Sequence, residues 1–258
     1  MIEEANTAQL RSPARFIVLV FALSVPFWLA GAAAGRLWQQ LPVSALMACC
    51  PVLAAVILTR REGPAAVGRL LGRAGDWRVI PNLRWYAPIV MPAPAVMAAS
   101  YLALVGLGRP LPGLRISALE VAVLAAVFVL GAAAEELGWT AYATDPLYRR
   151  WGLAAAGVAL GLVWGLWHLI PYLQAGHGPV WIAGQCVLTV ALRVIIVWLY
   201  VSTGSVFAAI VCHACANLAW TLFPDHGSHY DPLITGAIAS AVAAVMLVGR
   251  AVGARRRR

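Results

Sequence analysis

The chain alternates between long apolar runs and short segments that carry most of its charges. A helix of about 20 apolar residues is long enough to cross a hydrocarbon core of about 30 Å, and each apolar run has roughly that length. The pattern therefore predicts an all-α fold with about eight transmembrane helices. The runs are 16–34, 43–59, 85–107, 117–144, 152–172, 180–201, 205–223 and 232–249.

The composition supports a membrane protein. Hydrophobic residues make up 62% of the 258 residues, charged residues make up 11%, and the mean hydropathy is +0.81. A soluble domain has about 25% charged residues, so this chain has too few charges to cover a surface in water. We expect residues 1–258 to form a single transmembrane domain, a polytopic helix bundle.

The distribution of arginine predicts the orientation in the membrane. All 19 basic residues are Arg, and the formal net charge is +9. With a cytoplasmic N-terminus, 15 of the 19 fall in cytoplasmic segments, which is the bias that the positive-inside rule expects for an even number of spans. We therefore expect a multi-pass protein of the cell membrane with both termini in the cytoplasm. Its partners would include membrane lipids but no nucleic acid, because no basic patch is interleaved with aromatic residues.

Polar residues inside the spans mark a candidate site. A charge at the centre of a membrane helix costs about 2.5–3.5 kcal/mol on insertion scales, so it is rarely kept without a function. These residues are confined to the fourth to seventh spans, which predicts a polar centre there. Residues 16–116 would then form scaffold helices, 117–223 the catalytic core, and 224–258 the last helix and a basic tail. The polar residues are Glu135, Glu136, His168, Arg193, His213 and Asn217.

Their spacing suggests chemistry. His213 and Asn217 are four residues apart, so they share one face of a helix. Glu135 and Glu136 are adjacent, so they point about 100° apart, and both can ionise in a low dielectric only if a cation compensates. A carboxylate beside a histidine can act as a general base for water. The alternative is that these groups only hydrogen-bond the helices together.

Three motifs resemble the signature blocks of the CPBP intramembrane proteases. The motifs are EELGW (135–139), WGLWH (164–168) and TGSVFAAIVCHACAN (203–217). This family, also called Abi, is related to the CAAX prenyl endopeptidase Rce1. The resemblance covers about a third of the chain, 135–220. It implies an intramembrane endopeptidase that hydrolyses a peptide bond of a membrane-associated protein or peptide.

The resemblance also implies roles for the polar residues. Glu135, together with His168, would activate the attacking water. His213 and Asn217 would stabilise the oxyanion that forms at the scissile carbonyl, and preset donors of this kind are effective in a dry cavity. Glu136 would be a supporting carboxylate.

Two further positions bear on this site. Trp164 occupies the family's aromatic position and is expected to pack beneath His168. Thr140 stands where the family has an Arg, which would be a natural partner for Glu136 four residues earlier. Three readings of this departure remain open: Arg193 replaces the missing cation from across the bundle, Glu136 is protonated, or the chain is a degenerate member without activity.

The same residues raise the question of a metal. Glu135, His168 and His213 have the identities of a His₂Glu zinc site with an open position. The sequence has no HExxH helix, and Asn217 is better explained as an oxyanion donor than as a ligand. We therefore favour a metal-independent glutamate mechanism with no cofactor over a zinc mechanism. The alternative function is a non-enzymatic or degenerate family member that acts as a bacteriocin-immunity protein or as a membrane scaffold or binding protein.

Overall fold

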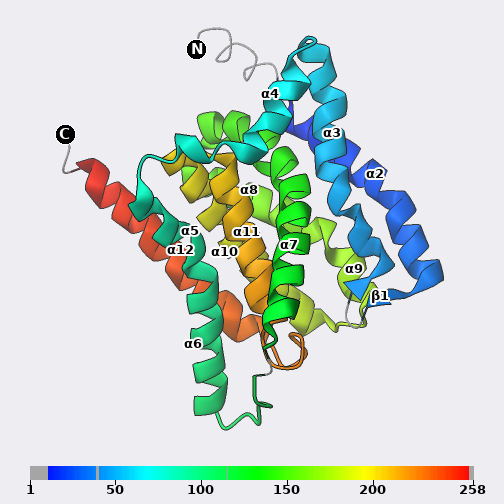
Figure 1. Ribbon diagram of the computed structural model, residues 1–258, viewed down its shortest axis with the longest axis vertical. Coiled ribbons are helices and arrows are strands. Elements are labelled where there is room, and N and C mark those ends of the chain that lie inside the picture. Colours follow the sequence, from blue (N-terminus) through cyan, green and yellow to red (C-terminus); the bar gives the residue numbers. More distant parts are fainter. Residues whose placement is uncertain (1–10, 39–40, 115, 256–258) are drawn as a thin grey trace.

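The computed structural model describes residues 11–38, 41–114 and 116–255, so the last three arginines of the basic tail lie outside it. In this part of the chain the fold is a bundle of long helices with one short two-stranded hairpin (Figure 1). The principal helices are α2 (Pro13–Ala34), α3 (Cys50–Thr59), α6 (Pro92–Gly106), α7 (Ala118–Gly138), α8 (Asp145–Trp167), α10 (Pro179–Thr203), α11 (Val206–Thr221) and α12 (Pro232–Arg255).

Shorter elements connect these helices. The hairpin of β1 (Arg36–Trp38) and β2 (Leu41–Pro42) follows α2. The remaining elements are η1 (Val43–Cys49), η2 (Arg60–Glu62), α4 (Ala66–Gly72), η3 (Arg73–Gly75), η4 (Trp77–Val79), η5 (Leu83–Trp85), α5 (Tyr86–Val90), η6 (Trp139–Thr144) and α9 (Leu169–Gln174). The described chain begins and ends at the same end of the bundle, where α4 also lies (Figure 1).

The fold class predicted from the sequence, a polytopic helical bundle, is confirmed. Six helical segments are long and apolar enough to cross a membrane, by length and composition. One of them, the 57-residue segment Ala118–Gln174, contains two of the eight predicted spans, and the shorter apolar helix Val206–Thr221 corresponds to a third. The difference between six and about eight therefore arises at these two places.

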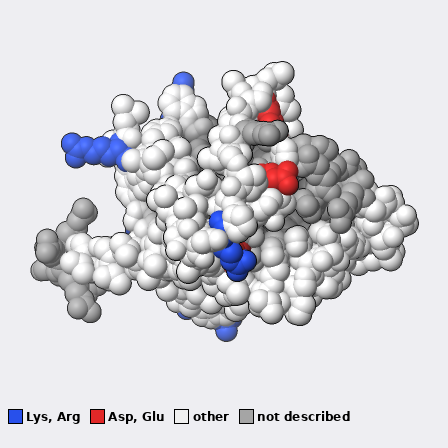
Figure 2. Space-filling model, turned by 90° about the horizontal axis from the view of Figure 1, so that it is seen from below, with Lys and Arg blue, Asp and Glu red and all other residues white. Residues whose placement is uncertain are grey.

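The outer surface of the bundle suits lipid. Large apolar side chains point outward on several helices; Leu119, Leu130 and Val245 are 74%, 73% and 72% exposed. Figure 2 shows the lower end of the bundle, where a few Arg, Asp and Glu side chains are scattered among other residues. In a hydrocarbon solvent this exposure carries no hydrophobic cost, because lipid tails are as apolar as leucine.

Proline interrupts two of the predicted spans. The third is broken at Met91, between α5 and α6, directly before Pro92. The fifth is broken at His168, between α8 and α9, three residues before Pro171. A proline has no N–H to give to the carbonyl four residues earlier, so the regular helix ends before it. His168 therefore lies at a break in the helix.

Helices α8 and α10 pack closely through glycine. Gly157 and Gly161 face α10, and a Cβ added at Gly161 would lie 2.7 Å from the Cα atom of Val190, while one at Gly157 would lie 3.0 Å from that of Val194. Small residues four positions apart allow two membrane helices to approach at backbone distance. This approach brings Arg193 of α10 against the part of α8 that carries the second motif.

Candidate active site

Glu136, near the end of α7, is the most densely hydrogen-bonded of the predicted site residues. Its side chain is fully buried. Its two carboxylate oxygens accept hydrogen bonds from Arg193 Nη1 at 2.7 Å and Arg193 Nη2 at 3.0 Å, and from Thr140 Oγ1 at 2.5 Å. A fourth contact joins Oε1 to His213 Nδ1 at 2.9 Å. A carboxylate has about four lone-pair positions, so Glu136 has little capacity to bind anything else.

Arg193 provides a cation for Glu136, a pairing that the sequence alone left undecided. It reaches Glu136 from α10 in a bidentate ion pair, and both side chains are 0% exposed. A buried charge is tolerated when it is paired and hydrogen-bonded, so the geometry favours an ionised Glu136. Thr140 adds a hydroxyl where the family has an Arg. That Arg193 replaces this Arg in function stays a prediction.

The contact with Glu136 determines how His213 is protonated. Because Glu136 already accepts three hydrogen bonds as a carboxylate, the proton in the fourth contact belongs to Nδ1 of His213. Neutral His213 then has a lone pair on Nε2. To donate from Nε2 to an oxyanion, His213 must carry a second proton.

Glu135 lies in different surroundings from its neighbour. It is 6% exposed, and its Oε2 atom accepts a hydrogen bond from the indole N–H of Trp164 at 2.8 Å. No hydrogen bond joins its other oxygen, Oε1, to another described residue. The 100° offset between adjacent helical positions has thus separated the two glutamates, as the sequence predicted.

His168 is half-buried at the break between α8 and α9. Its Nδ1 atom lies 2.9 Å from the backbone carbonyl oxygen of Trp164. A carbonyl only accepts, so Nδ1 carries the proton and neutral His168 has a lone pair on Nε2. Glu135 is close enough to His168 to interact with it electrostatically.

Trp164 contacts four other residues of this centre, including Glu135. Its ring makes edge contacts with His168, at a centroid distance of 5.6 Å, and with His213, at 4.9 Å. The guanidinium carbon of Arg193 lies 4.0 Å from the ring centroid. The contact with His168 was expected from the sequence. The contacts with Glu135, Arg193 and His213 were not.

Asn217 lies one turn beyond His213 on α11, as their spacing predicted. It is half-buried, and its side chain makes no hydrogen bond to another residue in the described part of the chain. Its amide therefore remains available as a donor.

The start of α11 is fixed by a residue that the sequence analysis did not single out. Asp76, between η3 and η4, accepts hydrogen bonds from the backbone N–H groups of Val206 and Phe207 at 3.1 and 2.9 Å. It also accepts one from the Ser205 hydroxyl at 2.7 Å. A carboxylate at a helix N-terminus satisfies unpaired N–H groups and the helix dipole. Asp76 thus holds the helix that carries His213 and Asn217.

The side chains proposed as alternative zinc ligands each have another partner. Glu135 accepts from Trp164, His213 contacts Glu136, and His168 contacts a backbone carbonyl. Among the described residues, no three His, Cys, Asp or Glu side chains are grouped so as to hold a metal ion. These contacts leave lone pairs on Glu135 Oε1 and on Nε2 of His168 and His213, which are the atoms that a zinc site would use.

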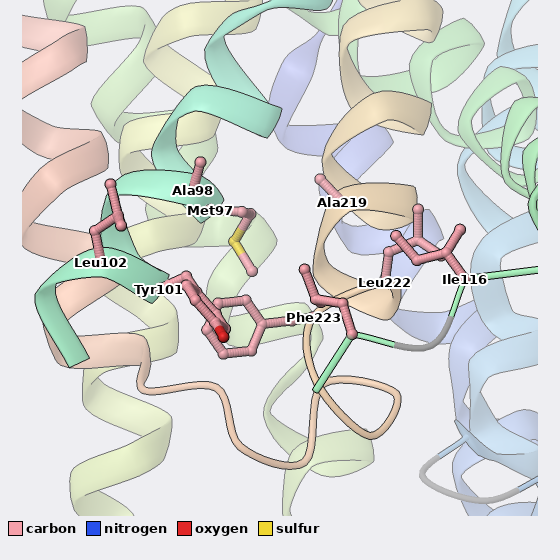
Figure 3. Close-up of a pocket in the computed structure, with 9 residues that line it drawn as sticks. Met97, Ala98, Tyr101, Leu102, Ile116, Ala219, Leu222 and Phe223 are labelled. Carbon is pink, nitrogen blue, oxygen red and sulfur yellow. The ribbon is translucent and has the colours of Figure 1, made fainter. Parts of the chain in front are cut away.

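An apolar pocket of about 350 Å³ lies on another side of α11 (Figure 3). Ala219 belongs to its wall, and it is offset by about 200° around the helix from Asn217. No predicted catalytic residue lines it. The lining residues are Met97, Ala98, Tyr101, Leu102, Leu114, Ile116, Ala219, Leu222 and Phe223.

Comparison with known proteins bears on this arrangement. The family described as type II CAAX prenyl endopeptidase Rce1-like matches residues 117–219, a range that contains all of the polar centre. Over this range the chain is similar to the Rce1-like endopeptidases. It is also 22% identical over 228 residues to CAAX prenyl protease 2 of Methanococcus maripaludis, a match that covers 80% of this chain and 83% of that relative. The comparisons support an intramembrane endopeptidase at the level of the family.

Proposed function

We propose that this protein is an intramembrane endopeptidase in which Glu135 and His168 activate a water molecule. The observation that carries this proposal is the contrast between the two glutamates. Glu136 is saturated by Arg193, Thr140 and His213, whereas the Oε1 atom of Glu135 has no hydrogen-bond partner among the residues that the structure describes. A general base needs a free lone pair within reach of the proton it removes.

The proposed reaction uses these groups in turn. Glu135 Oε1 takes a proton from water, and His168 orients the water by accepting from it at Nε2. The water oxygen bonds to the scissile carbonyl carbon and forms a tetrahedral oxyanion. The proton is then delivered to the amide nitrogen, the C–N bond breaks, and a new carboxyl terminus and a new amine are released.

Asn217 and His213 stabilise the oxyanion in this proposal. The Asn217 amide donates directly. His213 donates from Nε2 when its ring carries a second proton, while Nδ1 keeps its contact with Glu136. Arg193 and Thr140 act through Glu136, because they hold the carboxylate that orients the His213 ring.

The substrate class follows from where the site lies. The polar centre is built on apolar helices long enough to span a membrane, so the substrate is a membrane-associated protein or peptide. The curated relative is named a CAAX prenyl protease, which makes a lipid-modified tail one candidate. We place the protein in the cell membrane with both termini cytoplasmic.

The proposal is tested by mapping new protein termini in membranes from cells that carry the wild type or Glu135→Gln. Glutamine keeps an oxygen for the Trp164 N–H but cannot take a proton, so the fold is expected to survive while cleavage falls by about 10²- to 10⁴-fold. Glu120→Gln is the matched control, because Glu120 lies in the first turn of the same helix. Fragments that depend on Glu135 but not on Glu120 support the proposal. Identical termini in all three, with each protein folded and abundant, would favour the non-enzymatic alternative.

A further inference from the structure

We propose that Trp164 is a positioning residue that aims the Glu135 carboxylate at the water molecule. This inference rests on the proposed function of Glu135. Its basis is a single hydrogen bond, from Trp164 Nε1 to Glu135 Oε2 at 2.8 Å, which is the one hydrogen bond between the Glu135 side chain and another described residue. Without it the carboxylate would be free to rotate about its last two torsions.

The indole is held rigidly enough to serve this purpose. Trp164 is 4% exposed. One face lies against the Arg193 guanidinium, 4.0 Å from the ring centroid, and the ring also contacts His213. Arg193 is itself fixed by two hydrogen bonds to Glu136. The position of the N–H group is therefore determined by side chains from α7, α10 and α11.

These contacts join the two glutamates in one chain of interactions. Glu136 holds Arg193, Arg193 stacks on Trp164, and Trp164 donates to Glu135. A cation over an indole face draws electron density from the ring and makes its N–H a stronger donor. The fully paired Glu136 carboxylate thus helps to orient the Glu135 carboxylate, which takes the proton from water.

The chemistry of indole suits this task. Its N–H is a donor only, so it cannot exchange a proton with Glu135 or compete with it for the proton of water. It occupies Oε2 and leaves Oε1 for the reaction. A hydroxyl or an imidazole at the same place could accept as well as donate and would allow other arrangements.

The test removes the donor without changing the shape. Trp164 is replaced by 3-benzothienylalanine, in which a sulfur atom takes the place of the indole N–H. Loss of a hydrogen bond to a charged group is expected to lower kcat by about 10- to 100-fold. KM should stay unchanged, because the contact is made to the base and not to the substrate.

Trp167 is the matched control. It lies three residues later, is fully buried, and donates its own indole N–H to Ser24 Oγ at 2.7 Å, away from both glutamates. The same replacement at Trp167 is expected to leave kcat within about 3-fold. A second comparison pairs Trp164→His, which keeps a ring N–H, with Trp164→Phe, which does not. The histidine variant is expected to be the faster of the two.

The outcomes separate this inference from the proposed function. If the wild type cleaves, Glu135→Gln does not, and the isostere at Trp164 keeps full kcat, the positioning role is wrong and the proposed function stands. Equal losses at Trp164 and Trp167, or a change confined to KM, would also overturn it. If the wild type and Glu135→Gln show the same termini, the proposed function fails and the inference fails with it.

Discussion

Arg193 and Glu136 form a bidentate ion pair between α10 and α7, with both side chains inaccessible to solvent. The two residues are 57 positions apart in the sequence. In this pair Arg193 gives Glu136 a cation partner, and the same guanidinium lies over the Trp164 ring. Its removal is therefore the most informative change that the structure suggests.

Arg193→Leu is expected to lower the free energy of unfolding by about 3–5 kcal/mol, because it leaves Glu136 as an uncompensated buried carboxylate. Unfolding of the purified protein in detergent measures this loss, and proteolytic activity should fall with it. Arg150→Leu is the control, since Arg150 is exposed on α8. An Arg193→Leu protein with normal stability and activity would show that Arg193 does not replace the missing cation.

Thr140→Val removes the hydroxyl that donates to Glu136 and keeps nearly the same shape. We expect a loss of about 1.5–3 kcal/mol in the free energy of unfolding, the range for hydrogen bonds to charged groups. Thr189→Val removes a hydroxyl that donates at 2.8 Å to the neutral carbonyl of Gln185, and should cost about 1 kcal/mol. Equal effects in the two variants would mean that Thr140 adds nothing specific to the carboxylate.

Removal of metal should leave the enzyme active. We expect the purified protein to retain its cleavage rate after dialysis against a zinc chelator, and to contain no stoichiometric zinc by elemental analysis. Both results follow from a mechanism in which Glu135 and His168 activate water themselves. Activity that is lost on chelation and restored by added zinc would instead support the ligand set of Glu135, His168 and His213.

Gly161→Ala tests the close approach of α8 and α10. The added methyl would meet the backbone of Val190 at 2.7 Å, so the helices must separate, at a cost of about 1–3 kcal/mol in stability. The contact between Arg193 and Trp164 should loosen as well and lower kcat. Gly131→Ala, on α7, meets nothing within 4 Å and serves as the control. A Gly161→Ala protein as stable and active as the Gly131→Ala protein would contradict the argument.

Much of the fold was predictable because lipid imposes a simple rule on sequence. Each predicted span coincides with helical structure, since a backbone in hydrocarbon must satisfy its own hydrogen bonds. The interruptions were harder to place. The predicted helix 117–144 turns into the π-helical segment η6 after Gly138, and no feature of the residue pattern marks that change. Short π-helical segments of this kind occur often at functional sites.

The residues of the candidate site could be proposed from the sequence, but the contacts between them could not. Isolated polar residues in apolar spans identified Glu135, Glu136, His168, Arg193, His213 and Asn217. Which of them touch depends on helix rotation, and spacing along one helix says nothing about a neighbouring helix. The indole donor of Trp164 was missed because the sequence predicted only that this ring packs beneath His168, and spacing along one helix does not show where the indole N–H points. The glycines at 157 and 161 were a usable signal that α8 has a close neighbour.

Because Arg193 lies on α10, the order in which the helices are synthesised matters for Glu136. A chain synthesised from its N-terminus delivers α7, with both glutamates, well before α10 is complete. During that interval Glu136 has no counter-ion, and only the arrival of α10 neutralises it. The ion pair thus makes the arrangement of the polar centre conditional on correct assembly of the bundle. A chain in which α10 fails to dock keeps an acid in the membrane without its partner cation, at a large cost in free energy.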